Sequence, residues 1–390
     1  MNITKINYKI SFMELAFFLL IVGQIINKSS YNASVATNII GTMCALLFCV
    51  MYLMKGKLYF DFRNFIICIL VIISACISTF FSNIVDWSTD ATSLIICVIL
   101  YWMFSMIKIK KENMAHILRF YSFFCVFLSI WILYDFLFKI GIGWSGGATI
   151  EYWGIKKDPN YLASFLVVGF TYFLLSIFYS KKKNAVKFIL LSIVFLGIFF
   201  TGSRGSFLVI VIIILLTFWK KLIENKKGIK TYLALLFGIV VLVVGYEILM
   251  NTVLGERMLD SSSYSNNIRL IIWKNAMKVF KEHWFFGGGI QSGTVYSVAY
   301  TDFVTHNCYV DLITGQGILG TFIVFLLFLR IQFVSRSNRF FVFVIMLSFY
   351  GPLFFINGYE SLTFWLPLII CEDMRPILIT DSYKELLWIK

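Results

Sequence analysis

Long apolar stretches separated by short polar segments run along the 390 residues of this chain. A helix needs about 20 apolar residues to cross a bilayer, whereas barrel strands would show alternation. Because the apolar runs are continuous, the pattern predicts an all-α fold, a polytopic membrane bundle of about 12 transmembrane helices. The predicted spans are 11–27, 36–54, 64–82, 91–107, 118–138, 160–179, 187–201, 205–219, 231–250, 308–329, 340–357 and 361–373.

Two polar segments are longer than the other connections, and we expect both to face outward. The first, 140–159, is rich in glycine and aromatic residues, and the second, 251–305, precedes the tenth span. Connections beyond about 15 residues in a compact protein are usually functional or disordered. The aromatic residues and a helical pattern within 251–305 favour a functional external loop on a single membrane domain that covers 1–390.

An amphipathic helix is predicted inside the 251–305 loop, and it ends near Lys281. The helix is expected to start after a capping cluster formed by Ser263, Ser265 and Asn266. At 100° per residue, one face carries Arg269, Trp273, Ala276 and Phe280, and the opposite face carries Lys274, Lys278 and Lys281. A basic amphipathic helix usually lies along a membrane surface. Since Arg269 shares the apolar face, it either reaches back to the interface or points into a cavity.

Composition and charge agree with a membrane protein. The chain is 60% hydrophobic and 14% charged, with a mean hydropathy of +0.86. Its formal net charge of +14 comes mostly from Lys and Arg in alternate connections on one side of the predicted bundle. Because basic residues are retained in the cytoplasm, this side is cytoplasmic, as are both termini. The basicity therefore follows from topology, and we expect no nucleic-acid partner.

Candidate chemistry lies on the predicted outer face. Thr201-Gly202-Ser203-Arg204-Gly205 forms a polar turn between two spans, and His306 immediately precedes the tenth span. Arg204 and Arg269 could bind diphosphate oxygens with their planar guanidinium groups. A neutral His306 could accept a proton from an attacking hydroxyl, which typically contributes about 10²–10⁴ in rate. Together these groups suit transfer from a lipid diphosphate to an alcohol.

Each of these residues also has a simpler interpretation. Arg204 alone could be an anchor at the membrane boundary, and Arg269 could serve the same purpose on a helix that is already basic. His306 could only form hydrogen bonds at a helix end. Lys157, beside Asp158, is expected to be a solvated loop charge that flanks the site. The chain contains no motif for a metal–nucleotide sugar, a phosphate loop or a zinc protease, so we expect no metal and no cofactor.

The set of motifs resembles the O-antigen ligase/O-antigen polymerase superfamily of bacterial envelope glycosyltransferases. The resemblance covers about 158–320, in the order in which the motifs occur in the family. It rests on Asp158-Pro159-Asn160, Thr201-Gly202-Ser203-Arg204-Gly205, Arg269 with Trp273, Gly287 and Gly289, His306-Asn307 with Tyr309, and Gly317 and Gly320. One departure is His283-Trp284-Phe285-Phe286, where the family commonly has a proline before the glycines.

The resemblance implies metal-independent, inverting glycosyl transfer from an undecaprenyl diphosphate donor to a glycan acceptor. It places the chain in the bacterial inner (plasma) membrane with the active site outside, among membrane lipids, and implies a chain-length regulator protein as a partner. By the same resemblance Arg204 and Arg269 bind the donor diphosphate, while His306 activates the acceptor hydroxyl. The substrate-binding candidates are Ser203, Asn307, Tyr309, Trp273, Asp158, Asn160 and Lys157.

Three functions remain open from the sequence. The first is a polymerase that joins lipid-linked repeats of an O-antigen, capsule or exopolysaccharide. The second is a ligase that moves finished glycan to lipid A-core or to protein. The third is a lipid or solute transporter, a class that commonly carries acidic residues near the bilayer midplane. Here the acidic candidates Asp135 and Glu247 fall toward outer helix ends, which favours the enzymes.

Overall fold

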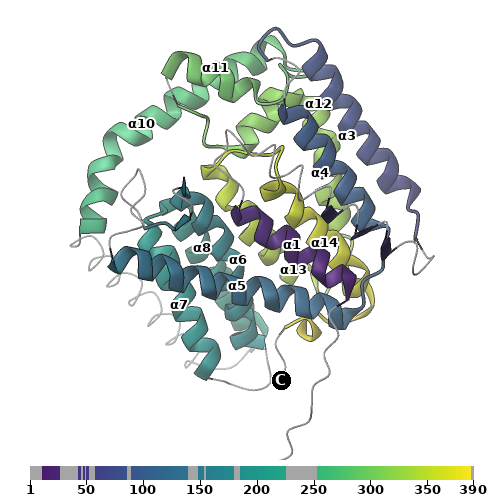
Figure 1. The fold of residues 1–390 in the computed structure, drawn as a ribbon, viewed down its shortest axis with the longest axis vertical. Coiled ribbons are helices and arrows are strands. Elements are labelled where there is room, and N and C mark those ends of the chain that lie inside the picture. Colours follow the sequence, from purple (N-terminus) through teal and green to yellow (C-terminus); the bar gives the residue numbers. More distant parts are fainter. Residues whose placement is uncertain are drawn as a thin grey trace, which may run out of the picture.

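The computed structural model of this chain is a helical bundle (Figure 1). It describes residues 11–26, 58–85, 89–138, 148–152, 155–179, 185–224, 253–301 and 303–387, with short helical pieces at 43–44, 47–48 and 50–51. The helices are α1 (Phe12–Ile26), α3 (Phe62–Phe80), α4 (Thr89–Ser105), α5 (Lys111–Leu137), α6 (Pro159–Tyr179), α7 (Ala185–Thr201), α8 (Arg204–Glu224), α10 (Val253–Glu282), α11 (Ser292–Thr301), α12 (Cys308–Ile331), α13 (Arg339–Tyr350) and α14 (Leu362–Thr380). Two 3-10 helices, η2 (Pro352–Phe355) and η3 (Tyr383–Glu385), flank α14 in sequence.

Helices occupy every predicted span that the described residues cover. The spans expected at 36–54 and 231–250 lie largely and wholly outside those residues, so the number of membrane crossings stays a prediction. Five of the described helices, α3, α5, α6, α8 and α12, are long and apolar enough to cross a bilayer. Since only internally bonded backbone is tolerated in lipid, apolar length is a strong predictor of these elements.

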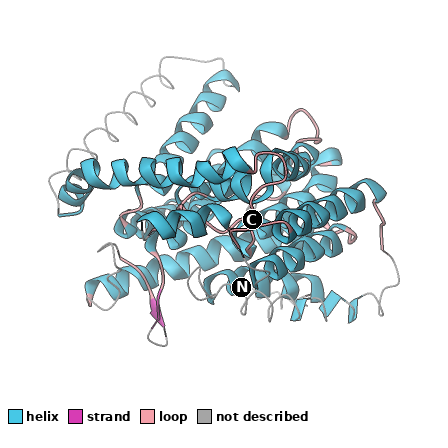
Figure 2. Ribbon diagram, turned by 90° about the horizontal axis from the view of Figure 1, so that it is seen from above, coloured by secondary structure: helices cyan, strands magenta, loops and turns pink. Residues whose placement is uncertain are grey.

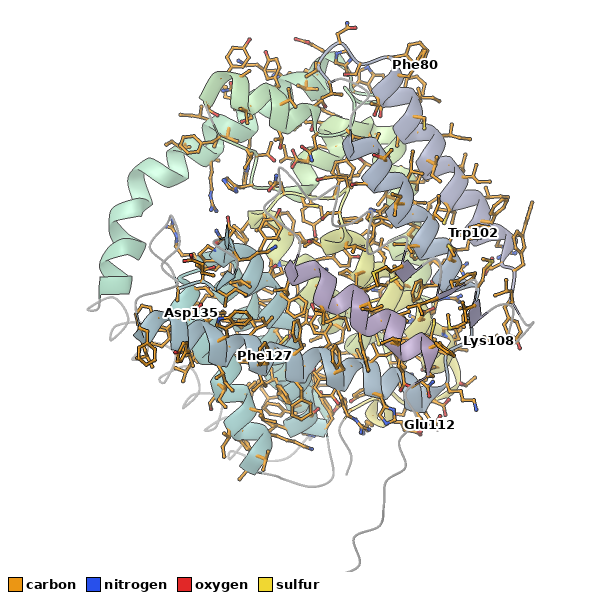
Figure 3. All side chains as sticks on the ribbon, in the orientation of Figure 1. Phe80, Trp102, Lys108, Glu112, Phe127 and Asp135 are labelled. Carbon is orange, nitrogen blue, oxygen red and sulfur yellow. The ribbon has the colours of Figure 1, made fainter. Side chains whose placement is uncertain are left out.

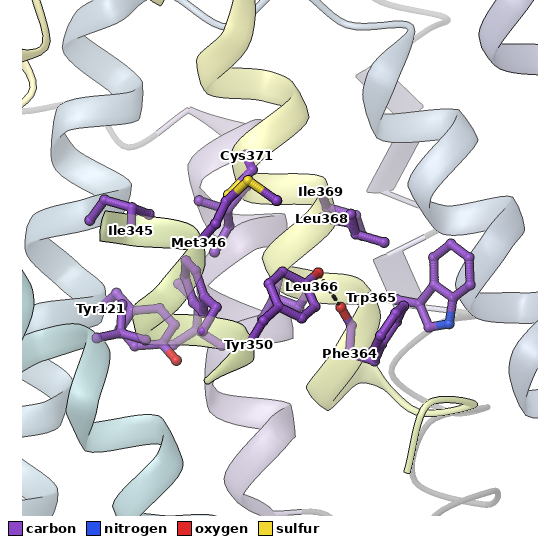
Figure 4. Packing of buried hydrophobic residues seen from close by; sticks show 14 of the residues in the cluster. Tyr121, Ile345, Met346, Tyr350, Phe364, Trp365, Leu366, Leu368, Ile369 and Cys371 are labelled. Carbon is purple, nitrogen blue, oxygen red and sulfur yellow. Dashed lines mark hydrogen bonds between the residues drawn. The ribbon is translucent and has the colours of Figure 1, made fainter. Parts of the chain in front are cut away.

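The bundle has two groups of helices with a third group between them. On one side α3 packs against α4 and α12, and on the other α5, α6, α7 and α8 pack together. Between them lie α1, α13 and α14, as Figure 1 shows. Figure 4 shows part of this central core, where the Tyr350 hydroxyl donates a 2.8 Å hydrogen bond to the carbonyl oxygen of Phe364. The helices α5 and α6 approach each other closely at Gly169. A Cβ at this position would lie 2.5 Å from the Cβ of Cys125, so the small residue permits the contact.

Three features of the two long connections differ from the sequence prediction. A two-stranded antiparallel hairpin, β1 (Glu151–Tyr152) and β2 (Ile155–Lys156), occupies part of 140–159, and Figure 2 shows it beside the helices. The second connection holds an additional helix, α11. The predicted start of the amphipathic helix after Ser263 was wrong, since α10 begins at Val253. Serine and asparagine cost only about 0.5–0.7 kcal/mol in a helix interior, so a polar cluster does not force a helix to start.

Candidate active site

Arg204 is the first residue of α8 and follows a tight turn. Gly202 has a φ of 66°, which a side chain would strain, and the Ser203 amide donates to the Thr201 hydroxyl at 3.3 Å. The next residue, Gly205, packs directly on Phe355, because an added Cβ would overlap that ring. A helix N-terminus carries partial positive charge, so this position disfavours a cation and favours a nearby anion.

Arg269 reaches the same aromatic ring from α10. Its guanidinium carbon lies 5.9 Å from the centroid of the Phe355 ring. Burial lowers the pKa of Arg269, the charge of Arg204 lowers it further, and the carboxylate of Asp158 opposes both effects. The two arginines are therefore close enough to repel each other. Arg269 is half-buried and packs on Phe355, whereas Lys274 on the opposite face of α10 is exposed.

His306 completes the cluster on a strained piece of backbone. Its φ of 47° lies in the left-handed region, which non-glycine residues seldom adopt and which is frequent at functional sites. Burial lowers the pKa of the half-buried imidazole, Asp158 raises it, and Arg269 lowers it. The imidazole thus lies in the electrostatic field of both groups and is kept largely neutral at pH 7. A neutral imidazole has a free lone pair and can accept a proton.

Hydrogen bonds on both sides hold His306 in place. The indole nitrogen of Trp273 donates to the Thr305 carbonyl at 2.9 Å, which ties α10 to the residue before His306. Asn307 caps α12, since its side-chain oxygen accepts from the amides of Tyr309 and Val310 at 3.0 and 3.2 Å. Because both neighbours are fixed, the strained conformation of His306 is maintained.

The Asp158-Pro159-Asn160 segment starts α6 and contributes the acidic group of the cluster. The Asp158 carboxylate accepts from the Asn160 amide at 2.7 Å, which is an N-cap followed by a proline in the first helical turn. Asp158 is exposed, and its charge reaches both His306 and Arg269. One carboxylate therefore both starts a helix and balances part of the positive charge.

Lys157 is buried, unlike the prediction from the sequence. The expectation of a solvated loop charge was wrong, because the side chain is only 7% exposed. It lines a cavity of about 30 Å³ together with Gln24, Tyr161 and Thr363. Burial lowers the pKa of Lys157 to about 8, while Asp158 raises it. The cavity is polar enough to hold water, and its lining contains neither arginine of the cluster.

The remaining substrate-binding candidates already have contacts within the protein. The Ser203 hydroxyl is buried and donates to Ser206 at 3.3 Å. The Tyr309 hydroxyl donates to the Tyr350 carbonyl at 2.6 Å. With Trp273 and Asn307 bonded as described above, these residues position the cluster, and ligand contacts by them stay predictions.

The glycines after α10 contact backbone of α12. Gly287, with a φ of 83°, lies against Gly315, where an added Cβ would be 2.5 Å from the carbonyl carbon. Gly317, with a φ of 62°, forms a kink in α12 and packs on the backbone of Phe285 in the same way. Two amides of α12, those of Ile318 and Leu319, donate to the carbonyls of Trp284 and Phe285 at 2.9 and 3.2 Å.

This backbone contact holds the end of α10, where the chain reads His283-Trp284-Phe285-Phe286 in place of the proline that is common in the family it resembles. It joins the end of α10, the helix that carries Arg269, to α12, the helix that His306 precedes. The glycines therefore lie where the two helices next to the site meet.

Sequence reasoning missed Phe355. The ring contacts both Gly205, the residue after Arg204, and the guanidinium group of Arg269. Cation–π contact favours a guanidinium group over such a ring. No sequence signal distinguished it, because the chain contains 42 phenylalanines.

Asp135, the described acidic candidate for a transport site, has a structural contact. It lies near the end of α5 (Figure 3), and its carboxylate accepts from the Glu151 amide at 3.2 Å. This bond joins α5 to the β1–β2 hairpin. Glu247 lies outside the described residues.

Part of the chain matches a known protein family. Residues 189–325 match the sequence model of the family Wzy_C, described as O-antigen ligase. The match contains Arg204, Arg269 and His306. No curated protein and no solved structure matched the chain.

Proposed function

We propose that this chain, whose residues 189–325 match the O-antigen ligase family model, polymerises glycan repeats carried on undecaprenyl diphosphate. The reaction takes place at the outer face of the bacterial cytoplasmic membrane. The observation that carries the proposal is the meeting of two arginines and a neutral histidine, all within the matched residues 189–325, with Asp158 from the preceding segment.

Arg204 and Arg269 bind the diphosphate of the donor. Two guanidinium groups that repel each other in a partly buried site favour a multiply charged anion between them. The N-terminus of α8 adds amide donors and a favourable dipole. During the reaction negative charge grows on the departing oxygen, so these groups stabilise the transition state more than the bound donor.

His306 accepts the proton of the acceptor hydroxyl. The hydroxyl oxygen attacks the anomeric carbon, and the bond from this carbon to the diphosphate oxygen breaks. The electron pair of that bond leaves with the diphosphate, and the proton moves to the imidazole. One in-line displacement inverts the anomeric centre. Asp158 stabilises the imidazolium that results, since its charge raises the pKa of His306.

Charge-removing variants test this proposal in a purified system with a lipid-diphosphate oligosaccharide as both donor and acceptor. We expect Arg204→Ala, Arg269→Ala and His306→Ala each to reduce chain extension at least about a hundredfold, the range of a lost general base or charge stabiliser. Lys274→Ala is the matched control, because it removes an exposed cation from the same helix as Arg269. Normal ladders of chain length from the three site variants would refute the proposed mechanism.

A ligase is the second candidate, and the description of the matching family favours it. Both reactions use the same donor and the same attack by a hydroxyl, so they differ in the acceptor. Deletion of the gene distinguishes them. Glycans of a single repeat indicate a polymerase, whereas free long polymer without attached glycan indicates a ligase.

A further inference from the structure

A buried carboxylate that the proposed reaction does not use lies close to the candidate active site. Asp311 stands in the first turn of α12, five residues after His306, and is 1% exposed. Its Oδ1 accepts a 2.9 Å hydrogen bond from the hydroxyl of Thr294 on α11. Burial of a carboxylate is costly unless other groups bond to it. The field of the helix N-terminus offsets part of this cost, but an exposed acid at the same helix end would gain from the field without being buried.

The hydrogen bond to Asp311 continues to the residue that precedes His306. The hydroxyl oxygens of Thr294 and Thr305 are 3.2 Å apart. A hydroxyl group has one hydrogen, and Thr294 donates its hydrogen to Asp311, so Thr305 is the donor to Thr294. A chain of hydrogen bonds therefore runs from Thr305 through Thr294 to the carboxylate. All three side chains are buried, so water does not compete for these bonds.

Three helices together hold Thr305 in place. The indole of Trp273 on α10 donates to the Thr305 carbonyl at 2.9 Å, and Thr294 on α11 bonds the Thr305 hydroxyl. The helix α11 is itself attached to α12, because the Ser292 hydroxyl donates to the Thr314 carbonyl at 3.2 Å. Figure 1 shows α11 beside α10 and α12. The short helix that the sequence did not predict thus connects the carboxylate on α12 to the segment that carries His306.

We propose that Asp311 is a positioning residue for His306. It acts through the hydroxyls of Thr294 and Thr305, and it keeps the backbone at His306 in the left-handed conformation with a φ of 47°. Strained backbone persists only where the surrounding structure over-determines it. The inference rests on the proposed function, because the imidazole is held for the proton transfer assigned to it there.

The electrostatics of the site agree with an action through hydrogen bonds. Burial lowers the pKa of His306, and the charges that act on it are those of Asp158 before α6 and Arg269 on α10. Arg204, at the start of α8, acts on Arg269 in turn. Since these three groups account for the charge around the imidazole, the contribution of Asp311 is to fix where the imidazole lies among them.

Two variants that break the chain at different ends test the inference. Asp311→Ala removes the acceptor, and Thr305→Val removes the donor hydroxyl while it keeps the shape of the side chain. We expect each to lower the kcat of chain extension at least about tenfold and to change the donor KM less than about twofold, because the arginines bind the donor. Both changes break the same chain, so the double variant should lose no more than the worse single variant.

A control and two conservative variants separate positioning from packing. Thr171→Val is the matched control, because Thr171 is as buried as Thr305 but donates to the Val167 carbonyl of its own helix at 2.8 Å. It should resemble the wild type. Asp311→Asn keeps an oxygen that accepts from Thr294, and Thr305→Ser keeps the hydroxyl, so both should stay within about threefold of the wild-type kcat. A loss in Asp311→Asn equal to that in Asp311→Ala would overturn the inference.

The NMR signal of the imidazole measures the position of His306 independently of turnover. The chain contains three histidines, so the signal of His306 in protein with labelled histidine is the one that His306→Ala removes. Because burial lowers the pKa of His306, release of the ring into solvent should raise the titration midpoint toward the ordinary value of about 6.5. We expect this rise in Asp311→Ala and Thr305→Val, and the wild-type midpoint in Asp311→Asn and Thr171→Val.

The two readouts also separate this inference from the proposed function. In a wild-type protein that extends glycans, variants that change neither kcat nor the midpoint, or only one of them, would overturn the inference. A midpoint that moves as expected in a protein that extends no glycan would refute the proposed function and support the positioning role. Loss of extension in His306→Ala, with kcat and midpoint unchanged in Asp311→Ala and Thr305→Val, would do the reverse. If Asp311→Ala does not fold, Thr305→Val decides.

Discussion

The contact between the exit of α10 and the kink of α12 allows a quantitative prediction for Gly287→Ala. The new Cβ would lie 2.5 Å from the carbonyl carbon of Gly315 and 2.6 Å from the amide nitrogen of Gln316, and neither backbone atom can rotate away. The φ of 83° adds strain of about 1–2 kcal/mol for a residue with a side chain. Overpacking adds about 1–3 kcal/mol, so the free energy of unfolding should fall by about 2–5 kcal/mol in total.

Gly288→Ala is the matched control for this prediction. Its Cβ would meet Val279 Cγ1 at 2.5 Å, which is the end of a side chain, and the backbone of Gly288 is not left-handed. We expect a loss of about 1 kcal/mol. Thermal unfolding of the two purified variants in the same detergent measures the difference.

Catalysis should respond as well, because Gly287 fixes α10 on α12. A misplacement of about 1 Å between Arg269 and His306 can cost about a hundredfold in rate. The rate of chain extension per folded molecule should therefore fall more in Gly287→Ala than in Gly288→Ala. Equal stability and equal rates in the two variants would show that the backbone contact does not position the site.

Two further predictions concern charges. Arg330→Ala removes a guanidinium group that donates to the buried Glu372 at 2.9 Å. The free energy of unfolding should therefore fall by about 3 kcal/mol, while the donor KM of the folded fraction stays unchanged. Unchanged thermal unfolding would contradict this prediction. The acid limb of the pH–rate profile should have its midpoint below 6.5, because burial lowers the pKa of His306 and only the neutral form accepts a proton. Asp158→Asn removes a charge that raises this pKa, so the limb should shift further toward low pH; a shift toward high pH would refute the assignment.

The sequence predicted the helices well, because lipid leaves few alternatives for a long apolar run. The limits of α6, α7 and α12 follow from apolar stretches bounded by Pro159, by the turn before Arg204 and by the cap Asn307. The start of α10 was wrong because local capping preferences are weak compared with packing. The hairpin of two-residue strands could not be predicted, since such short strands have no detectable alternation.

The candidate site was partly visible in the sequence. Because the chain is only 14% charged, its charged and polar residues at predicted helix ends stood out, among them Arg204, Arg269 and His306. In the structure the charges of Arg204 and Asp158 act on Arg269, and those of Asp158 and Arg269 act on His306. The burial of Lys157 was not visible, because a lysine beside a proline turn usually remains in solvent. The contact of Gly287 with α12 was not visible either. A glycine in the sequence can indicate a close approach, but it does not identify the residue that it approaches.

The electrostatics of the candidate site support the proposal that the two arginines bind an anion. A residue that only anchors a helix at the membrane surface gains by reaching water. Arg269 instead is half-buried on the Phe355 ring, where burial and the charge of Arg204 both lower its pKa. Asp158 offsets only part of this unfavourable charge, and Arg204 also stands at the positive end of α8. A bound diphosphate would reverse the sign of these interactions, and this is the reason for our proposal that the two arginines bind one.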